Sequence, residues 1–257
     1  MPGHIWLALG EYDYAAAVNE RAAQVDREYF ASTAAISGNY FDYYFSYLHN
    51  LVFVVYARAM QGRIAETRKA IDAIHEAMSP IAQSMPGLVG LMSVYVWMIE
   101  MRMGMWDELL AVQQPNGENA FVAGIWHYGR ALALRGKERL VEAREQRQNF
   151  EQMRKKIDGN MLWGADKLDD VMELAAASLD ARLETDPAAA VDKWRRTVDL
   201  QDRLRYFEPP PWYYPVRESL GAALLIPAKR LALRLYFGTD CGGARTTVGC
   251  CLVCARV

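Results

Sequence analysis

Three histidines carry the clearest ligand chemistry in the chain, because each lies among aromatic residues in a stretch that has the pattern of a helix. These residues are His4, His49 and His127. Where similar helices recur along a chain, their equivalent faces can line one surface, so the imidazoles could bind a metal ion or a carboxylate ligand, together with Glu208. Metal ligands must converge within about 2 Å of the ion. Nothing in the spacing requires that convergence, so we favour the hypothesis that each histidine is packed and hydrogen-bonded between helices.

The sequence contains no recognisable catalytic motif. A nucleophile elbow, a zinc-protease helix, a phosphate-binding loop and a dinucleotide-binding glycine fingerprint are all absent. The paired carboxylates Asp169-Asp170 stand near an expected helix start, where acidic side chains interact favourably with the helix dipole. We therefore predict a protein that is not an enzyme and that needs no cofactor and no metal.

Aromatic residues are concentrated in two further segments. Residues 40–47 hold six aromatic side chains, which we expect to pack between neighbouring helices or, alternatively, to line a peptide-binding groove. In residues 209–215 the prolines predict a rigid connector that docks Trp212 on the helices. Arg217 is then placed to pair with Glu208 or to stack on an aromatic ring. The candidate groove residues are His4, Tyr47, His49, Asn50, Trp126, His127, Glu208, Trp212, Tyr213 and Arg217.

Periodicity and turn residues predict helices through almost all of the first 225 residues. Residues 64–78 place apolar side chains at helical spacing. Residues 88–99 form an apolar run that is too short to span a bilayer, so they predict a buried helix. Asp186-Pro187 predicts a helix start, with an N-cap followed by proline at the first helical position. Helix ends are expected at Gly10, Gly62, Gly104 and Gly136.

The module around the first of these glycines resembles the tetratricopeptide repeat (TPR). Gly10, Tyr12 and Ala15 match the glycine–aromatic–alanine turn of that repeat, and Ala22 and Asp26 match its second alanine and its closing acid. The turn glycines recur at intervals of 52, 42 and 32 residues, against about 34 residues for the repeat. The resemblance implies an all-α, right-handed solenoid of antiparallel helix pairs over residues 1–225, with exposed end repeats.

Four short segments are similar to a bacterial subgroup of these proteins: residues 1–5, residues 47–50, residues 126–128 and residues 208–217. Members of that subgroup are usually longer at both ends. The resemblance therefore implies that Met1 is an internal methionine and that earlier repeats are absent.

Residues 226–257 differ from the rest of the chain. They hold all four cysteines, and Asp240 is their only acidic residue. A zinc site is disfavoured, because Cys241 is a poor fourth ligand for the cluster formed by Cys250, Cys251 and Cys254. We hypothesise that this tail is translated out of frame, since a shift of one base allows a TPR-like helix, and we predict that it is poorly ordered. The nucleotide sequence of the gene decides this.

The leading functional prediction is a non-catalytic scaffold that binds a peptide or a partner helix in a concave groove. The alternatives are a metal- or small-ligand-binding protein that uses His4, His49 and Glu208, and a decayed gene fragment without function. The formal net charge of -2 disfavours nucleic acid as the main partner, and no apolar run predicts a membrane segment. We expect a cytoplasmic protein whose exposed end repeats can self-associate.

Overall fold

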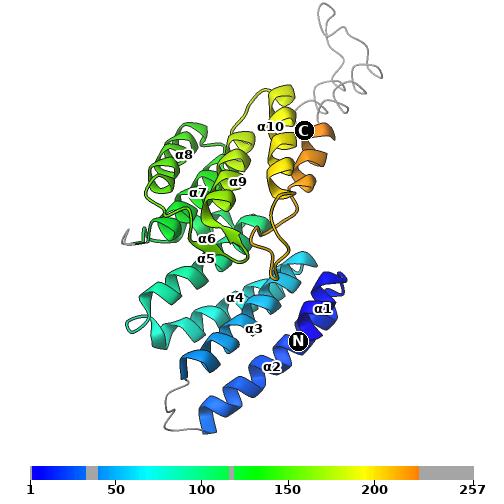
Figure 1. Ribbon diagram of the computed structural model, residues 1–257, viewed down its shortest axis with the longest axis vertical. Coiled ribbons are helices and arrows are strands. Elements are labelled where there is room, and N and C mark those ends of the chain that lie inside the picture. Colours follow the sequence, from blue (N-terminus) through cyan, green and yellow to red (C-terminus); the bar gives the residue numbers. More distant parts are fainter. Residues whose placement is uncertain (1, 33–39, 116–118, 226–257) are drawn as a thin grey trace, which may run out of the picture.

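The computed structural model describes residues 2–32, 40–115 and 119–225, the side chains of residue 32 and of residues 40–44 excepted. Most of this chain is helical (Figure 1), which confirms the predicted all-α class. The helices are α1 (Pro2–Ala8), α2 (Tyr12–Ser32), α3 (Tyr40–Met60), α4 (Ile64–Met78), α5 (Pro86–Met103), α6 (Trp106–Ala111), α7 (Ala120–Gly136), α8 (Leu140–Arg154), α9 (Leu168–Arg182) and α10 (Pro187–Gln201). Residues 217–225 are also helical. The predictions about the tail, residues 226–257, lie outside the described residues.

Two short elements interrupt the helices. A 3₁₀ turn, Ser79–Ile81, follows α4. Strands β1 (Leu162–Trp163) and β2 (Asp166–Lys167) pair antiparallel in a minimal hairpin before α9. They are the only strands in the part of the chain that the structure describes.

Four helix-to-helix turns share one hydrogen-bonding pattern. Each has a residue with positive φ just after the first helix: Gly10, Gly62, Gly104 and Glu138. At Gly104 its N–H donates to the carbonyl three residues back over 3.3 Å, and the next N–H donates to the carbonyl of Glu100 over 2.9 Å. The other three turns repeat both bonds. This is the Schellman closure of a helix C-terminus, which satisfies carbonyls that the helix itself leaves free.

The fourth turn corrects the prediction from sequence. Helix α7 continues through Gly136, and the residue with positive φ is Glu138, whose φ is 63°. Glu138 lies 34 positions after Gly104. A left-handed conformation is unfavourable for a residue with a Cβ, so nothing in the sequence marks Glu138 as the turn residue.

The turn between α9 and α10 is built differently and follows the sequence prediction. The Asp186 carboxylate accepts a hydrogen bond from the Ala189 N–H at 2.7 Å, and Pro187 occupies the first turn of α10. Here the side chain of Asp186 satisfies a free backbone N–H at the start of α10. In the other four turns, backbone N–H groups satisfy carbonyls at the end of the first helix.

The apolar core runs from one helix pair to the next through α5. Alternate faces of this helix contribute to two clusters: Val96 and Ile99 pack with α1 to α4, while Val94 and Met98 pack with α7 to α10. Apolar residues occupy all sides of α5 apart from Glu100 and Arg102 near its end, and most of its second half is buried, as predicted. None of the helices in the described ranges combines the length and apolar character needed to cross a membrane.

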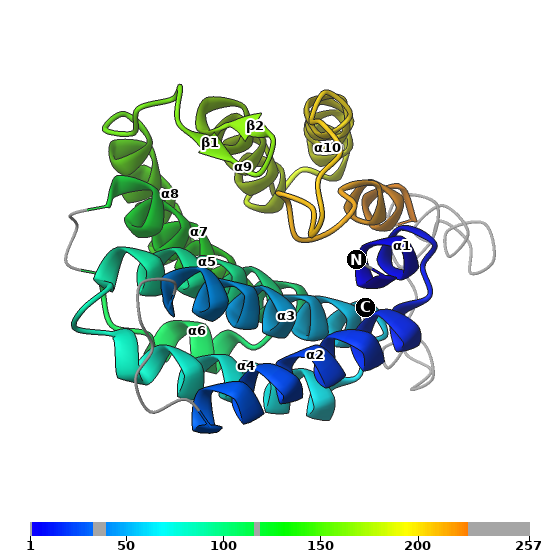
Figure 2. The ribbon, with the colours of Figure 1, turned by 60° about the horizontal axis from the view of Figure 1, so that its bottom comes forward.

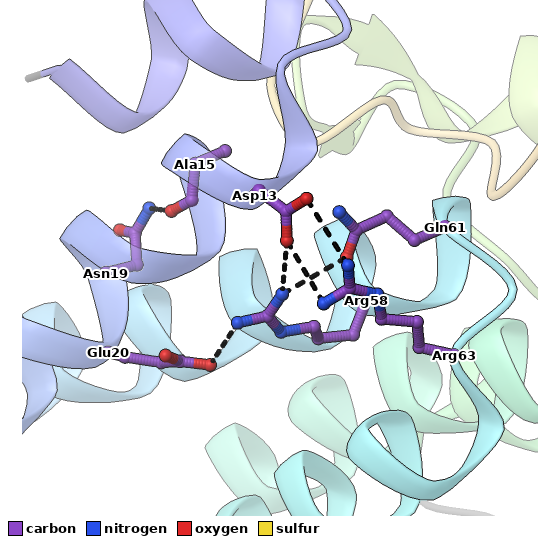
Figure 3. A network of polar contacts seen from close by, with 7 residues as sticks. All are labelled: Asp13, Ala15, Asn19, Glu20, Arg58, Gln61 and Arg63. Atoms are coloured by element: carbon purple, nitrogen blue, oxygen red, sulfur yellow. Dashed lines mark hydrogen bonds and ion pairs between the residues drawn. The ribbon is translucent and has the colours of Figure 1, made fainter.

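A polar network fixes α2 against α3 (Figure 3). The guanidinium of Arg58 donates to Asp13 and to Glu20, both over 3.0 Å. Arg63 adds a second ion pair to Asp13, over 3.1 Å. Because Asp13 and Glu20 lie two helical turns apart on α2, Arg58 holds the register between the two helices.

Residues 203–215, which we call the strap, lie on the inner side of the curve formed by the helices (Figure 2). The strap contacts several helix pairs. The Trp212 ring packs on Tyr128 of α7, 5.5 Å between centroids, and the Trp163 indole of β1 donates to the Pro211 carbonyl over 3.1 Å. Trp212 is 1% exposed, which confirms its predicted docking.

Candidate functional site

The structure brings together three of the predicted site residues. His4 on α1 and Glu208 on the strap lie 3.1 Å apart, from Nδ1 to Oε2, although 204 positions separate them. The His4 ring stacks on His49 of α3 at 5.4 Å, and Phe53 packs against both imidazoles. This cluster joins the first two helix pairs to the strap.

The electrostatics of this cluster favour a neutral His49. Burial lowers the pKa of His49, and the neighbouring His4 lowers it further. Its Nε2 atom is buried without a hydrogen-bond partner. Tyr206 donates to the other carboxylate oxygen of Glu208. Among the described residues, no three histidine, cysteine or acidic side chains are arranged to hold a metal ion.

The remaining candidates on α3 and α7 lie in helix junctions. Tyr47 packs its ring on Phe30 at 5.8 Å, and the Asn50 amide donates to Asp26 over 3.0 Å. The Trp126 indole donates to the Val112 carbonyl over 3.2 Å. All three are buried, so each has a packing partner that accounts for its position.

His127 lies apart from the other two histidines. It is buried, and its Nδ1 contacts the Gln146 side chain over 2.7 Å. Burial lowers its pKa. The structure therefore assigns His127 to the contact between α7 and α8, which is the packed and hydrogen-bonded role favoured from sequence.

Arg217 and Tyr213 have partners that the sequence did not indicate. The prediction for Arg217 is wrong: its guanidinium pairs with Asp202, with 2.6 Å from Nη2 to Oδ2, and not with Glu208 or a ring. Tyr213 is buried in a hydrogen-bonded network, where its hydroxyl lies 3.3 Å from that of Tyr128. Burial raises the pKa of Tyr128 and of Tyr213 well above the ordinary value, so both remain neutral phenols.

A groove lined by arginines opens beside this network, with a volume of about 750 Å³. Its walls are the ends of α3, α5, α7 and α9, the start of α6 and residues 213–222. Its charged side chains are Arg102, Arg135, Arg182 and Glu218. We call it the arginine groove. With three cations and one anion, it presents an excess of positive charge to any occupant.

The three arginines differ in how far the protein already satisfies them. Arg102 pairs with Glu218 over 3.2 Å. Arg182 donates to Ser219 over 2.9 Å and lies over the Trp194 ring at 5.1 Å. Arg135 is half-buried, its Nε has no hydrogen-bond partner, and none of the described carboxylates forms an ion pair with it. Arg135 is therefore the cation of the groove that is free to bind an anion.

Glycine shapes the wall next to Arg135. A Cβ at position 136 would lie 2.6 Å from Nε1 of Trp106, closer than packed atoms approach. The absence of a side chain at Gly136 therefore lets the Trp106 indole lie flat against α7 at the edge of the arginine groove.

These arginines were not predicted from the sequence, although their positions along the helices follow a pattern. A basic residue stands in the last turn of four alternate helices: Arg58 in α3, Arg102 in α5, Arg135 in α7 and Arg182 in α9. Cations are favourable at helix C-termini, so a comparison of the last turns of the expected helices would have identified these four arginines.

No family model, no curated protein and no solved structure matches this chain significantly. The likeness to TPR proteins therefore depends on the residues quoted above, and the assignment of a site depends on the geometry of the chain itself.

Proposed function

We propose that this chain is a non-catalytic interaction scaffold of the TPR type, a right-handed solenoid of antiparallel helix pairs. The support is the repetition of one turn. Four Schellman closures join successive helices with the same two hydrogen bonds, and the core continues through α5 from one pair to the next. A repeated unit whose core continues into its neighbour is the physical definition of a solenoid.

The proposed ligand is an acidic segment of a partner protein, held in the arginine groove. The observation that carries this proposal is the unpaired guanidinium of Arg135 within a groove that holds two further arginines and one acid. A peptide carboxylate can accept two parallel N–H bonds from a guanidinium, which gives both affinity and orientation. The half-buried Trp106 in the groove wall supplies apolar contact beside the charge.

The inner face of the curve, next to α1 and α3, is a less favourable binding surface for a partner protein. There the strap already packs on the helices, with Pro209 and Pro210 facing α3 and α5 across a narrow apolar cavity. The chain beyond Leu225 carries five Lys or Arg residues and one acidic residue, so it lacks the negative charge that the arginine groove favours. These two observations favour a segment of another protein as the occupant.

Selection from a random peptide display library tests the proposal. Peptides rich in Asp and Glu are expected to be enriched on the wild-type protein. Arg135→Glu should abolish that enrichment, because it turns the free cation into an anion.

Arg195→Glu is the matched control for charge. Arg195 is exposed on α10 and pairs locally with Asp192 at 2.9 Å, so its reversal should leave the selection unchanged. The proposal fails if Arg135→Glu enriches the same acidic peptides as the wild type, or if the wild type enriches no acidic peptide.

A further inference from the structure

A second cavity, with a volume of about 400 Å³, lies between the strap and the first two helix pairs. We call it the aromatic cleft. Its walls carry five aromatic residues and one acidic residue, which are Tyr12, Tyr56, Tyr206, Phe207, Trp212 and Glu208. The cleft shares none of its lining residues with the arginine groove, so the two are separate sites.

The acid of the cleft is a buried carboxylate without a permanent counter-cation. The Glu208 side chain is 7% exposed. His4 contacts one of its oxygens and brings a full positive charge only when protonated, and Tyr206 contributes a neutral hydroxyl to the other. Burial of a carboxylate is costly unless a cation offsets it.

The one basic residue that lines the cleft is directed elsewhere. The side chain of Arg205 is 71% exposed, and its Nε lies 4.0 Å from the buried carboxylate of Asp166. The backbone N–H of Arg205 also donates to Asp166, over 3.0 Å. Arg205 is therefore associated with Asp166 and forms no ion pair with Glu208.

The aromatic walls favour a positive charge as well. The face of an aromatic ring attracts a cation, most strongly where water is excluded. Tyr56 and Trp212 form the buried part of the wall, while Tyr206 is 75% exposed at its edge. Burial raises the pKa of Tyr56 to about 12, and the negative charges around it, Glu208 included, contribute. Tyr56 thus stays a neutral phenol beside the carboxylate.

We propose that the aromatic cleft binds a small organic ammonium ion, with its charge facing Glu208 and its alkyl groups against the aromatic rings. An organic cation needs one anion and several ring faces. It does not need the three converging ligands that a metal requires, and the described residues provide no such group.

Calorimetric titration of the full chain with choline tests this proposal, with 3,3-dimethylbutan-1-ol as the uncharged molecule of the same shape. Choline is expected to bind saturably at pH 7.5. The alcohol should bind at least about tenfold more weakly, because it lacks the charge that the rings and the carboxylate attract.

Two variants assign the binding to this cleft. Glu208→Gln keeps the shape and the acceptor oxygen, and it should weaken choline at least about tenfold. Tyr206→Leu alters a residue that is mostly exposed, so it should not disturb folding, and it should weaken choline about threefold or more. The control is Glu173→Gln on α9, which does not line the cleft and whose half-exposed carboxylate lies 3.5 Å from Arg196; it should bind choline like the wild type.

Three results would overturn the proposal. The first is no choline binding to the folded wild type. The second is equal affinity for choline and the alcohol, which would mean that only an apolar cavity is recognised. The third is undiminished choline binding in both Tyr206→Leu and a folded Glu208→Gln, which would place the binding elsewhere.

Discussion

Replacing Glu100 by glutamine is expected to stabilise the protein at pH 8 and to have much less effect at pH 5. Glu100 lies on α5, is 6% exposed, and has one carboxylate oxygen buried without a hydrogen-bond partner. Burial, with a smaller contribution from the charge of Glu108, raises its pKa from the ordinary 4.5 to about 7, against a lowering effect of Arg68. The carboxyl group therefore resists ionisation in the folded state.

The sign and size follow from proton linkage. Between pH 4.5 and 7 the folded protein binds more protons at Glu100 than the unfolded chain does, so the free energy of unfolding falls as pH rises. Each pH unit of the gap corresponds to about 1.36 kcal/mol. The full cost of ionisation above pH 7 is thus about 3 kcal/mol, and most of it appears between pH 5 and 8.

Urea unfolding of wild type and Glu100→Gln at both pH values measures this effect. The gain in the free energy of unfolding from Glu100→Gln should be about 2–3 kcal/mol larger at pH 8 than at pH 5. Glu173→Gln, at a half-exposed site on α9, should show no such difference. Equal effects of Glu100→Gln at the two pH values would refute the reasoning about a buried, unpaired carboxyl.

Three further substitutions and one control test a helix turn, a helix cap and the packing at Gly136 by the same unfolding measurement. Glu138→Gly should stabilise by about 0.5–1 kcal/mol, because it relieves a left-handed conformation; destabilisation would contradict the turn. Gly136→Ala should cost about 1–3 kcal/mol through overlap with Trp106, whereas Gly221→Ala meets no atom within 4 Å and should be neutral or stabilising. Asn119→Ala should cost about 1 kcal/mol, because Asn119 caps the start of α7 through two backbone N–H groups; an unchanged stability would mean that the cap contributes nothing.

The helices and three of the repeated turns could be predicted from sequence, because glycine marks a left-handed helix end. Gly10, Gly62 and Gly104 each have positive φ, as expected. The fourth turn could not be placed, because Glu138 carries the same conformation without a glycine. Only the shared hydrogen bonds show that it belongs to the series.

The candidate sites were only partly predictable. The residues of the histidine cluster were named from sequence, but the contact between His4 and Glu208 joins the first helix to the strap, and no local pattern contains it. Lys and Arg nearly balance Asp and Glu over the whole chain, so the net charge gave no sign of the arginines at the helix ends. Whether one of these arginines can bind a ligand depends on its tertiary partners. Arg58 forms ion pairs with Asp13 and Glu20, whereas Arg135 forms no ion pair among the described residues.

The central claim is that Arg135 recognises an acidic residue of a partner. A double-mutant cycle tests it directly, using the tightest acidic peptide from the display selection and a version of that peptide with its essential acid replaced by glutamine. These are titrated against wild type and Arg135→Ala. We expect a coupling energy of at least about 1 kcal/mol between the two side chains. If the losses in binding free energy from the two single changes add within about 0.5 kcal/mol, Arg135 and the acid of the peptide do not contact each other, which would contradict the proposal.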